Sequence, residues 1–148
     1  MTTTIEAESA PPVGGLTDAC LLVADIPRSV AFYRDRCGFA LKRLDTGFAE
    51  FHTRGVILAL WQRDDIAGHL RLPELTAGGA SCMVAVKLPS VAAVDAEYAR
   101  LSAAGVAFVE PPKTYVWNAH CAYFRDPDGH LWELYHWLGA PRVIEGSP

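Results

Sequence analysis

The chain has 148 residues, 51% of them hydrophobic, so it can bury a core of its own as one compact domain. Its formal net charge is −4 and it has no cluster of basic residues, which argues against a nucleic-acid-binding function. No apolar run is long enough to span a membrane, and the polar first fifteen residues lack a secretory signal pattern. We therefore expect a cytoplasmic protein with reduced thiols, and we interpret Cys20 and Cys82 as small core residues.

Two segments of the chain show the same order of predicted elements. Each begins with an apolar strand, continues with a helix that ends at a glycine, and finishes with three further strands. The two glycines, Gly38 and Gly105, stand where a left-handed C-terminal cap is required. The predicted elements are strand 16–23, helix 27–37 and strands 39–43, 48–53 and 56–61, then strand 81–88, helix 91–104 and strands 106–110, 119–124 and 131–137. The sequence thus predicts an α+β fold made of two tandem βαβββ modules.

The domain boundaries follow from the same pattern. We expect one domain over residues 16–137, with module one at 16–63 and module two at 81–137. Residues 64–80, with mixed charges and several glycines, are interpreted as a solvated connector. The segments 1–15 and 138–148 are polar or rich in proline and glycine, which is typical of chain tails.

The strongest local signal is a turn, Asp126-Pro-Asp-Gly129, between two strands of alternating polarity. Glu133 follows it on the second strand, between Leu131 and Tyr135 on the same face. Because burying an unpaired carboxylate is costly, Glu133 is expected to face a cleft, a partner or a metal. The alternative is that it faces water on a half-exposed sheet.

Several stretches resemble the vicinal oxygen chelate superfamily, which includes glyoxalases, bleomycin-resistance proteins and extradiol dioxygenases. The resemblance is carried by 23–33 (VADIPRSVAFY) with 37–39 (CGF), by 126–133 (DPDGHLWE), and by 115–120 (YVWNAH). It covers about residues 16–137. It implies that the two modules curl mixed sheets around a cleft and that the protein is often a homodimer.

The resemblance also implies where a metal would bind, at one position on the first strand and one on the last strand of each module. Those positions fall on Asp18 and Ala59 in module one and on Ser81 and Glu133 in module two. Ala59 cannot bind a metal and Ser81 is a poor ligand. Asp18 and Glu133 alone could hold only a weakly bound Mg²⁺ or Ca²⁺ ion. We therefore expect no cofactor, and we interpret the five histidines as surface or core residues: His52, His69, His120, His130 and His136.

What remains is an aromatic cleft with an acidic group. The Tyr123 side chain precedes Glu133 by ten residues, a spacing at which extradiol-type members place an active-site tyrosine. Flat aromatic walls with few polar groups suit a planar or amphipathic molecule. The candidate ligand-binding residues are Asp18, Phe51, Trp61, Trp117, Cys121, Tyr123, Glu133 and Tyr135.

Three functions remain open. The leading hypothesis is a metal-independent protein that binds or sequesters a small molecule, as the bleomycin-resistance branch does. The alternative is a lyase, isomerase or dioxygenase-like enzyme that uses Glu133 as base and Tyr123 as acid. A third is an accessory protein with a vestigial cleft. We expect a homodimer in which Trp117 and Trp137 are candidates for burial.

Overall fold

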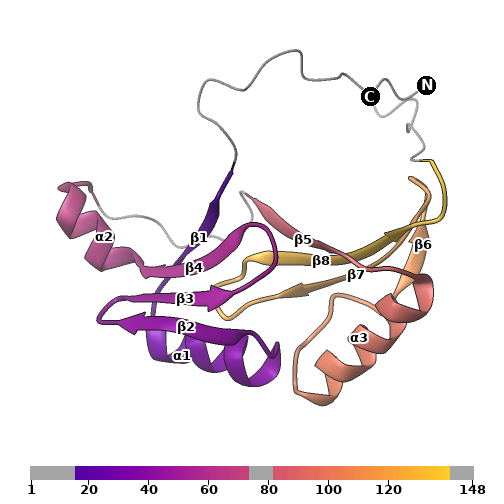
Figure 1. Cartoon of the computed structure of the whole chain (residues 1–148), viewed down its shortest axis with the longest axis horizontal. Coiled ribbons are helices and arrows are strands. Elements are labelled where there is room, and N and C mark those ends of the chain that lie inside the picture. Colours follow the sequence, from indigo (N-terminus) through magenta and orange to yellow (C-terminus); the bar gives the residue numbers. More distant parts are fainter. Residues whose placement is uncertain (1–15, 74–81, 141–148) are drawn as a thin grey trace, which may run out of the picture. The chain divides into compact units, whose positions relative to one another are not determined.

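The computed structural model describes residues 16–73 and 82–140, which form two compact units (Figure 1). The first contains the described part of Gly15–Cys82 together with Arg125–Leu131, and the second contains Met83–Phe124 and the segment that begins at Trp132. The turn of the last hairpin therefore packs with the first module, although it lies within the sequence of the second.

Each unit is built on a four-stranded mixed sheet, which confirms the predicted α+β class. The first sheet has the order β1-β4-β3-β2, with β1 parallel to β4 and the other pairs antiparallel. The second sheet has the equivalent order β5-β8-β7-β6. The strands are β1 Asp18–Val23, β2 Ala40–Asp45, β3 Phe48–His52, β4 Ile57–Gln62, β5 Met83–Lys87, β6 Lys113–Tyr115, β7 Ala119–Arg125 and β8 Leu131–Trp137.

The first helix packs on β3 and β4. It is an α-helix, α1, over Ile26–Ala31, and continues as a π-helical turn over Phe32–Arg36. Asp25 caps the start by accepting a hydrogen bond from the Arg28 backbone N–H. The helix ends before Gly38, whose φ of 85° confirms the predicted left-handed cap.

The second helix, α3, spans Val91–Ala103 and ends before Gly105, whose φ is 89°. The Ser90 side chain caps its start by accepting from the Ala93 N–H. Its buried residues are Val94 and Leu101, which lie seven residues apart and therefore on one face of the helix.

One helix was not predicted and one strand was misplaced. Helix α2 occupies Arg63–Leu70 at the start of the segment 64–80, with two acidic residues in its first turn where the helix dipole favours them. The third strand of module two lies at Lys113–Tyr115 rather than at 106–110. The earlier segment makes only an isolated bridge between Phe108 and Phe124. Pro111 and Pro112, which lack backbone N–H groups, separate it from the strand that follows.

The cysteine interpretation also needs correction. Cys20 and Cys82 are exposed, whereas Cys121 is fully buried. On β1 the buried side chains are Leu21 and Val23, so Cys20 lies on the opposite face of the strand.

Candidate functional site

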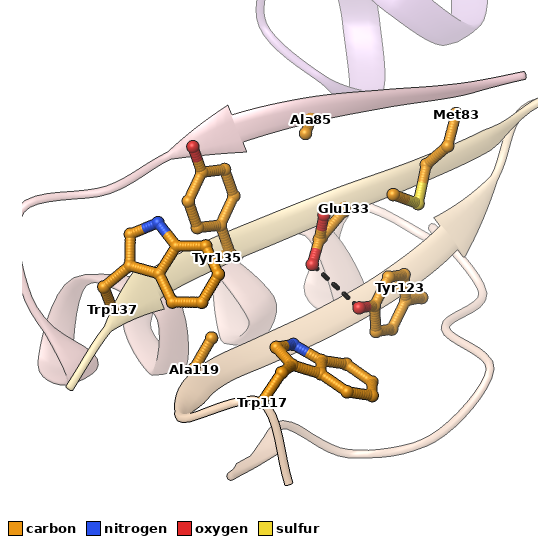
Figure 2. Close-up of a pocket in the computed structure, with 8 residues that line it drawn as sticks. All are labelled: Met83, Ala85, Trp117, Ala119, Tyr123, Glu133, Tyr135 and Trp137. Atoms are coloured by element: carbon orange, nitrogen blue, oxygen red, sulfur yellow. Dashed lines mark hydrogen bonds between the residues drawn. The ribbon is translucent and has the colours of Figure 1, made fainter. Parts of the chain in front are cut away.

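A pocket of about 440 Å³ lies on the sheet of the second unit. Four aromatic rings, one carboxylate and three smaller side chains form it (Figure 2). The residues that line it are Met83, Ala85, Trp117, Ala119, Tyr123, Glu133, Tyr135 and Trp137.

Strand alternation places most of these side chains on one face. Met83 and Ala85 are two apart on β5, and Glu133, Tyr135 and Trp137 are two apart on β8. Because β5 and β8 are neighbours in the sheet, the two rows form a continuous wall. The small Ala85 leaves the space beside this wall open.

Trp117 reaches the pocket from a turn and not from a strand. Tyr115 on β6 pairs with Ala119 on β7, so residues 116–118 form a three-residue hairpin loop. Asn118 adopts the left-handed conformation with φ 72°, which such loops need at this position. The Trp117 ring stacks on Tyr115, with centroids 4.5 Å apart, and this contact orients it.

A polar pair occupies the pocket between these rings. The Tyr123 hydroxyl donates a hydrogen bond of 2.7 Å to Oε1 of Glu133 (Figure 2). Burial, and then the hydrogen bond and charge of Glu133, raise the pKa of Tyr123 far above its ordinary value, so the phenol stays protonated. Burial and the same carboxylate raise the pKa of the neighbouring Cys121 thiol to about 11. Glu133 thus lies beside two groups that keep their protons.

The candidate residues of the first module are not among those that line this pocket. Phe51 is fully buried and contacts the rings of Tyr33 and Phe39, so the structure places it in the core of the first unit. Trp61 donates from Nε1 to Asp65 on α2 at 2.9 Å, which fixes its ring in the first unit. Sequence parity could not show this, because α2 was not predicted.

Of the positions that the resemblance assigned to a metal, the structure describes Asp18, Ala59 and Glu133. Asp18 is exposed and accepts from its neighbour Thr17 at 2.6 Å, and Ala59 has no donor atom. Ser81 lies outside the described residues. Within 16–73 and 82–140 no group of three or more His, Cys, Asp or Glu side chains could hold a metal ion.

The histidines with described contacts have partners in the protein. His120 makes a 2.8 Å contact with Asp95 of α3, and His136 contacts the Leu88 carbonyl oxygen at 2.9 Å. His130 binds Asp126 at 2.8 Å within the hairpin turn. The contacting ring nitrogens are Nε2 of His120 and Nδ1 of His130 and His136, and none of the three residues lines the pocket.

Four pocket residues were missed from the sequence as ligand-binding candidates: Met83, Ala85, Ala119 and Trp137. Trp137 shares parity with Glu133 and Tyr135, so the alternation of β8 could have identified it. Ala85 and Ala119 give no positive signal, because their contribution is the space that a small side chain leaves.

The sequence and fold of the chain have known relatives. Residues 15–134 match the model of the Glyoxalase/Bleomycin resistance protein/Dioxygenase superfamily. The chain belongs to this superfamily. A crystal structure of a superfamily member from Nocardioides is 41% identical, with a TM-score of 0.79 over 93% of this chain and 92% of that one. The predicted family is therefore confirmed.

Two further proteins are similar to the chain in sequence, and a third shares its fold. An uncharacterised Bacillus subtilis protein, YraH, is 31% identical over 80% of this chain and 94% of its own length. A bleomycin resistance protein of Geobacillus stearothermophilus is 28% identical over 75% of this chain and 88% of its own. A lactoylglutathione lyase from Agrobacterium tumefaciens shares the fold, with a TM-score of 0.68 over 85% of this chain and 96% of that one, but only 21% identity.

None of the helices in the described ranges has the length and apolar character needed to cross a membrane.

Proposed function

We propose that this superfamily member binds a small organic molecule in the aromatic pocket of its second module and does not transform it. The observation that carries the proposal is the position of Glu133. Its carboxylate lies in a pocket of about 440 Å³ whose walls are aromatic, and Tyr123 holds it in place. Flat rings can cover the body of a ligand while one fixed polar group orients it.

The proposal gains support from the relatives named bleomycin resistance protein. It is also consistent with a donor set at Asp18, Ala59 and Glu133 that does not suit a transition metal. We propose that the protein works without a metal or other cofactor.

The second candidate is an enzyme that uses Tyr123 and Glu133 for acid–base chemistry. Their hydrogen bond of 2.7 Å is the observation in its favour. A catalytic tyrosine needs a pKa near the working pH, however, and here the pKa of Tyr123 is raised well above its ordinary value. Tyr123 is therefore better suited to hold Glu133 than to transfer a proton, and we favour binding.

A steric block tests the binding proposal. Ala85 is exposed and lines the pocket, so Ala85→Leu adds bulk to the pocket without disturbing the core. Compounds from a library of aromatic and amphipathic molecules that raise the melting temperature of the parent protein should lose this effect with Ala85→Leu. The matched control is Ala92→Leu on the exposed side of α3.

The result that contradicts the proposal is equally specific. If every stabilising compound acts on Ala85→Leu as it does on Ala92→Leu, the pocket is not the binding site. If a bound compound is converted to a product at a rate that Glu133→Gln abolishes, the enzyme candidate replaces the binding proposal.

We also propose a homodimer in the cytoplasm. Val116 and Leu138 are 70% and 45% exposed and flank the two pocket tryptophans, Trp117 and Trp137. The Leu138 N–H donates to the Asn118 carbonyl at 2.9 Å, so these apolar side chains belong to one region. A second chain would cover such a surface. Sedimentation of the parent as a monomer at high concentration would contradict the dimer.

A further inference from the structure

The pocket of the second module carries a formal negative charge that no lining residue balances. Glu133 is the only charged side chain among the eight residues that line it. Its two polar neighbours, Tyr123 and Cys121, are neutral proton donors. Lys113 on β6 is not a lining residue, and it forms an ion pair with Glu110 at 2.6 Å and packs over the Tyr115 ring. An anionic ligand would therefore be repelled, and a cation would neutralise the pocket.

The aromatic rings around Glu133 favour a cation for a second reason. Figure 2 shows the Glu133 carboxylate between Tyr135 on one side and Tyr123 on the other, with Trp117 and Trp137 completing the wall. The face of each ring carries negative charge from its π electrons, and tryptophan and tyrosine are among the strongest such partners of a cation. Ring faces and a carboxylate thus act together on the same space.

The number of hydrogen-bond acceptors decides which kind of cation fits. A primary ammonium has three N–H donors and loses strong hydration when it leaves water. The carboxylate of Glu133 already accepts from Tyr123 through Oε1, and the only other side-chain oxygen acceptors among the lining residues are the hydroxyls of Tyr123 and Tyr135. The rest of the wall is aromatic or aliphatic, so the N–H donors of a primary ammonium that face it would lose their hydration without gaining a partner. A nitrogen that carries methyl groups instead of hydrogens avoids this cost and presents an apolar surface to the rings.

We propose that the pocket recognises a methylated ammonium group, tertiary or quaternary, with its positive charge beside Glu133 and its methyl groups against the aromatic rings. Ala85 and Ala119 leave the room that such a bulky head group needs, and Met83 offers a flexible apolar contact. The inference rests on the proposed binding function and names the chemical class of its ligand.

The experiment compares two soluble probes that differ in one atom. Choline carries a trimethylammonium group, and 3,3-dimethylbutan-1-ol has the same shape with a neutral carbon in place of nitrogen. Isothermal titration or tryptophan fluorescence should show choline binding at least about tenfold more tightly. Ethanolamine, the primary ammonium counterpart, should also bind more weakly than choline.

Variants assign the preference to named side chains. Glu133→Gln keeps the shape of the side chain and should remove most of the difference between choline and its neutral counterpart. Ala85→Leu should weaken both probes equally, because it fills the pocket. Ala92→Leu on α3 should bind both probes as the parent does, which controls for a general effect of added bulk. Circular dichroism verifies that each variant is folded.

The outcomes separate this inference from the binding proposal. Equal affinity of the two probes in the parent, with loss of both in Ala85→Leu, overturns the ammonium class and leaves small-molecule binding intact. Tighter binding of ethanolamine than of choline overturns the requirement for methyl groups. Failure of choline to bind at millimolar concentration also overturns the inference, while the library screen on Ala85→Leu still decides whether the pocket binds another molecule.

Discussion

The Tyr123 hydroxyl donates to the Glu133 carboxylate across β7 and β8, and the two groups are 2.7 Å apart in a pocket that is otherwise aromatic. Ten residues of sequence separate them, and the hairpin brings them onto the same face of the sheet. The phenol offers one strong donor to a carboxylate that is partly removed from water. The hydrogen bond between Tyr123 and Glu133 fixes where the charge of the pocket lies.

Tyr123→Phe should lower the free energy of unfolding by about 1 kcal/mol, because one hydrogen bond to a charged group is lost and water can replace it at the partly exposed Glu133. Urea denaturation measures the effect. Tyr135→Phe is the matched control on β8, since its hydroxyl has no hydrogen-bond partner among the described residues. Equal losses in the two variants would mean that the Tyr123–Glu133 hydrogen bond adds nothing to stability.

Asp128 should be one of the most sensitive polar positions for folding. Its side chain is 3% exposed and accepts from the Ala24 N–H at 2.8 Å, Arg28 at 3.1 Å, Ser29 at 3.3 Å and Arg63 at 3.4 Å. Asp128→Ala leaves these donors without their acceptor and should lower the free energy of unfolding by about 3 kcal/mol. The ion pair with Arg28 contributes least to this loss, because the Arg28 side chain is half exposed and water screens its charge.

The comparison for Asp128 is Asp35→Ala. Asp35 pairs with Arg34 on the surface of the first helix, where both side chains are about half exposed, so its loss should leave the unfolding free energy nearly unchanged. Similar denaturation midpoints for the two variants would contradict the proposed role of Asp128 in fixing the turn.

The turn should also make stability depend on pH. Asp126 accepts from the Tyr33 hydroxyl at 2.6 Å and contacts His130 Nδ1 at 2.8 Å, and this side-chain hydrogen bond raises the pKa of His130. The charge of nearby Asp128 also raises the pKa of His130, while burial and the charge of Arg63 lower it. A raised folded-state pKa stabilises the protein below the ordinary value of about 6.5, and this stability is lost as pH rises through the folded-state pKa.

The contribution of Asp126 to stability depends on pH in the opposite direction. Burial alone would raise its pKa, but the hydrogen bonds from His130 and Tyr33 hold it below its ordinary value of 3.8. Its stabilising effect is present above that value and is lost as pH falls through the lower folded-state pKa. Urea unfolding as a function of pH checks both limits. His130→Gln should remove the loss of stability above neutral pH, and an unchanged profile would refute the assignment to His130.

Three of the four cysteines should react with a thiol reagent in a fixed order. Cys82 is exposed and should be modified first. Cys20 should follow, because partial desolvation of its thiol and the charge of Asp18 raise its pKa and reduce the thiolate fraction. Cys121 is fully buried with a pKa of about 11, so it should react only after unfolding. Timed alkylation with peptide mass spectrometry checks the order, and early modification of Cys121 would contradict its burial on β7.

The purified protein should carry no stoichiometric transition metal. Ala59 has no donor atom, and Asp18 and Glu133 offer only carboxylate oxygens, which suit Mg²⁺ or Ca²⁺ better. Elemental analysis that finds about one zinc, nickel, manganese or iron ion per chain would contradict this prediction.

The repeated strand order was readable from the sequence because its signals are local. Alternating apolar residues and the two glycines, Gly38 and Gly105, constrain the backbone within a few positions. Helix α2 was missed because only Ala67 of its residues is buried, so no apolar stripe marks it. The third strand of module two was misplaced because the apolar pattern of residues 106–110 is typical of a strand, whereas the pairing begins only after Pro111 and Pro112.

The polarity of the site was also visible in the sequence, since alternation on β8 places Glu133 on the same face as Tyr135. Which residues line the site was not visible in the sequence. Phe51 and Trp61 are as aromatic as the pocket rings, and only packing shows that one is buried and that the other binds Asp65.

The sequence by itself determined the family, the two βαβββ modules and the strand that carries Glu133, because each depends on patterns a few residues long. Tertiary structure alone decided that residues 125–131 pack with the first unit and that Asp128 accepts from Ala24, 104 residues away. It also decided that Ala85 and Ala119 open a pocket. Contacts across such separations depend on how whole sheets pack, and no local pattern of side chains records them.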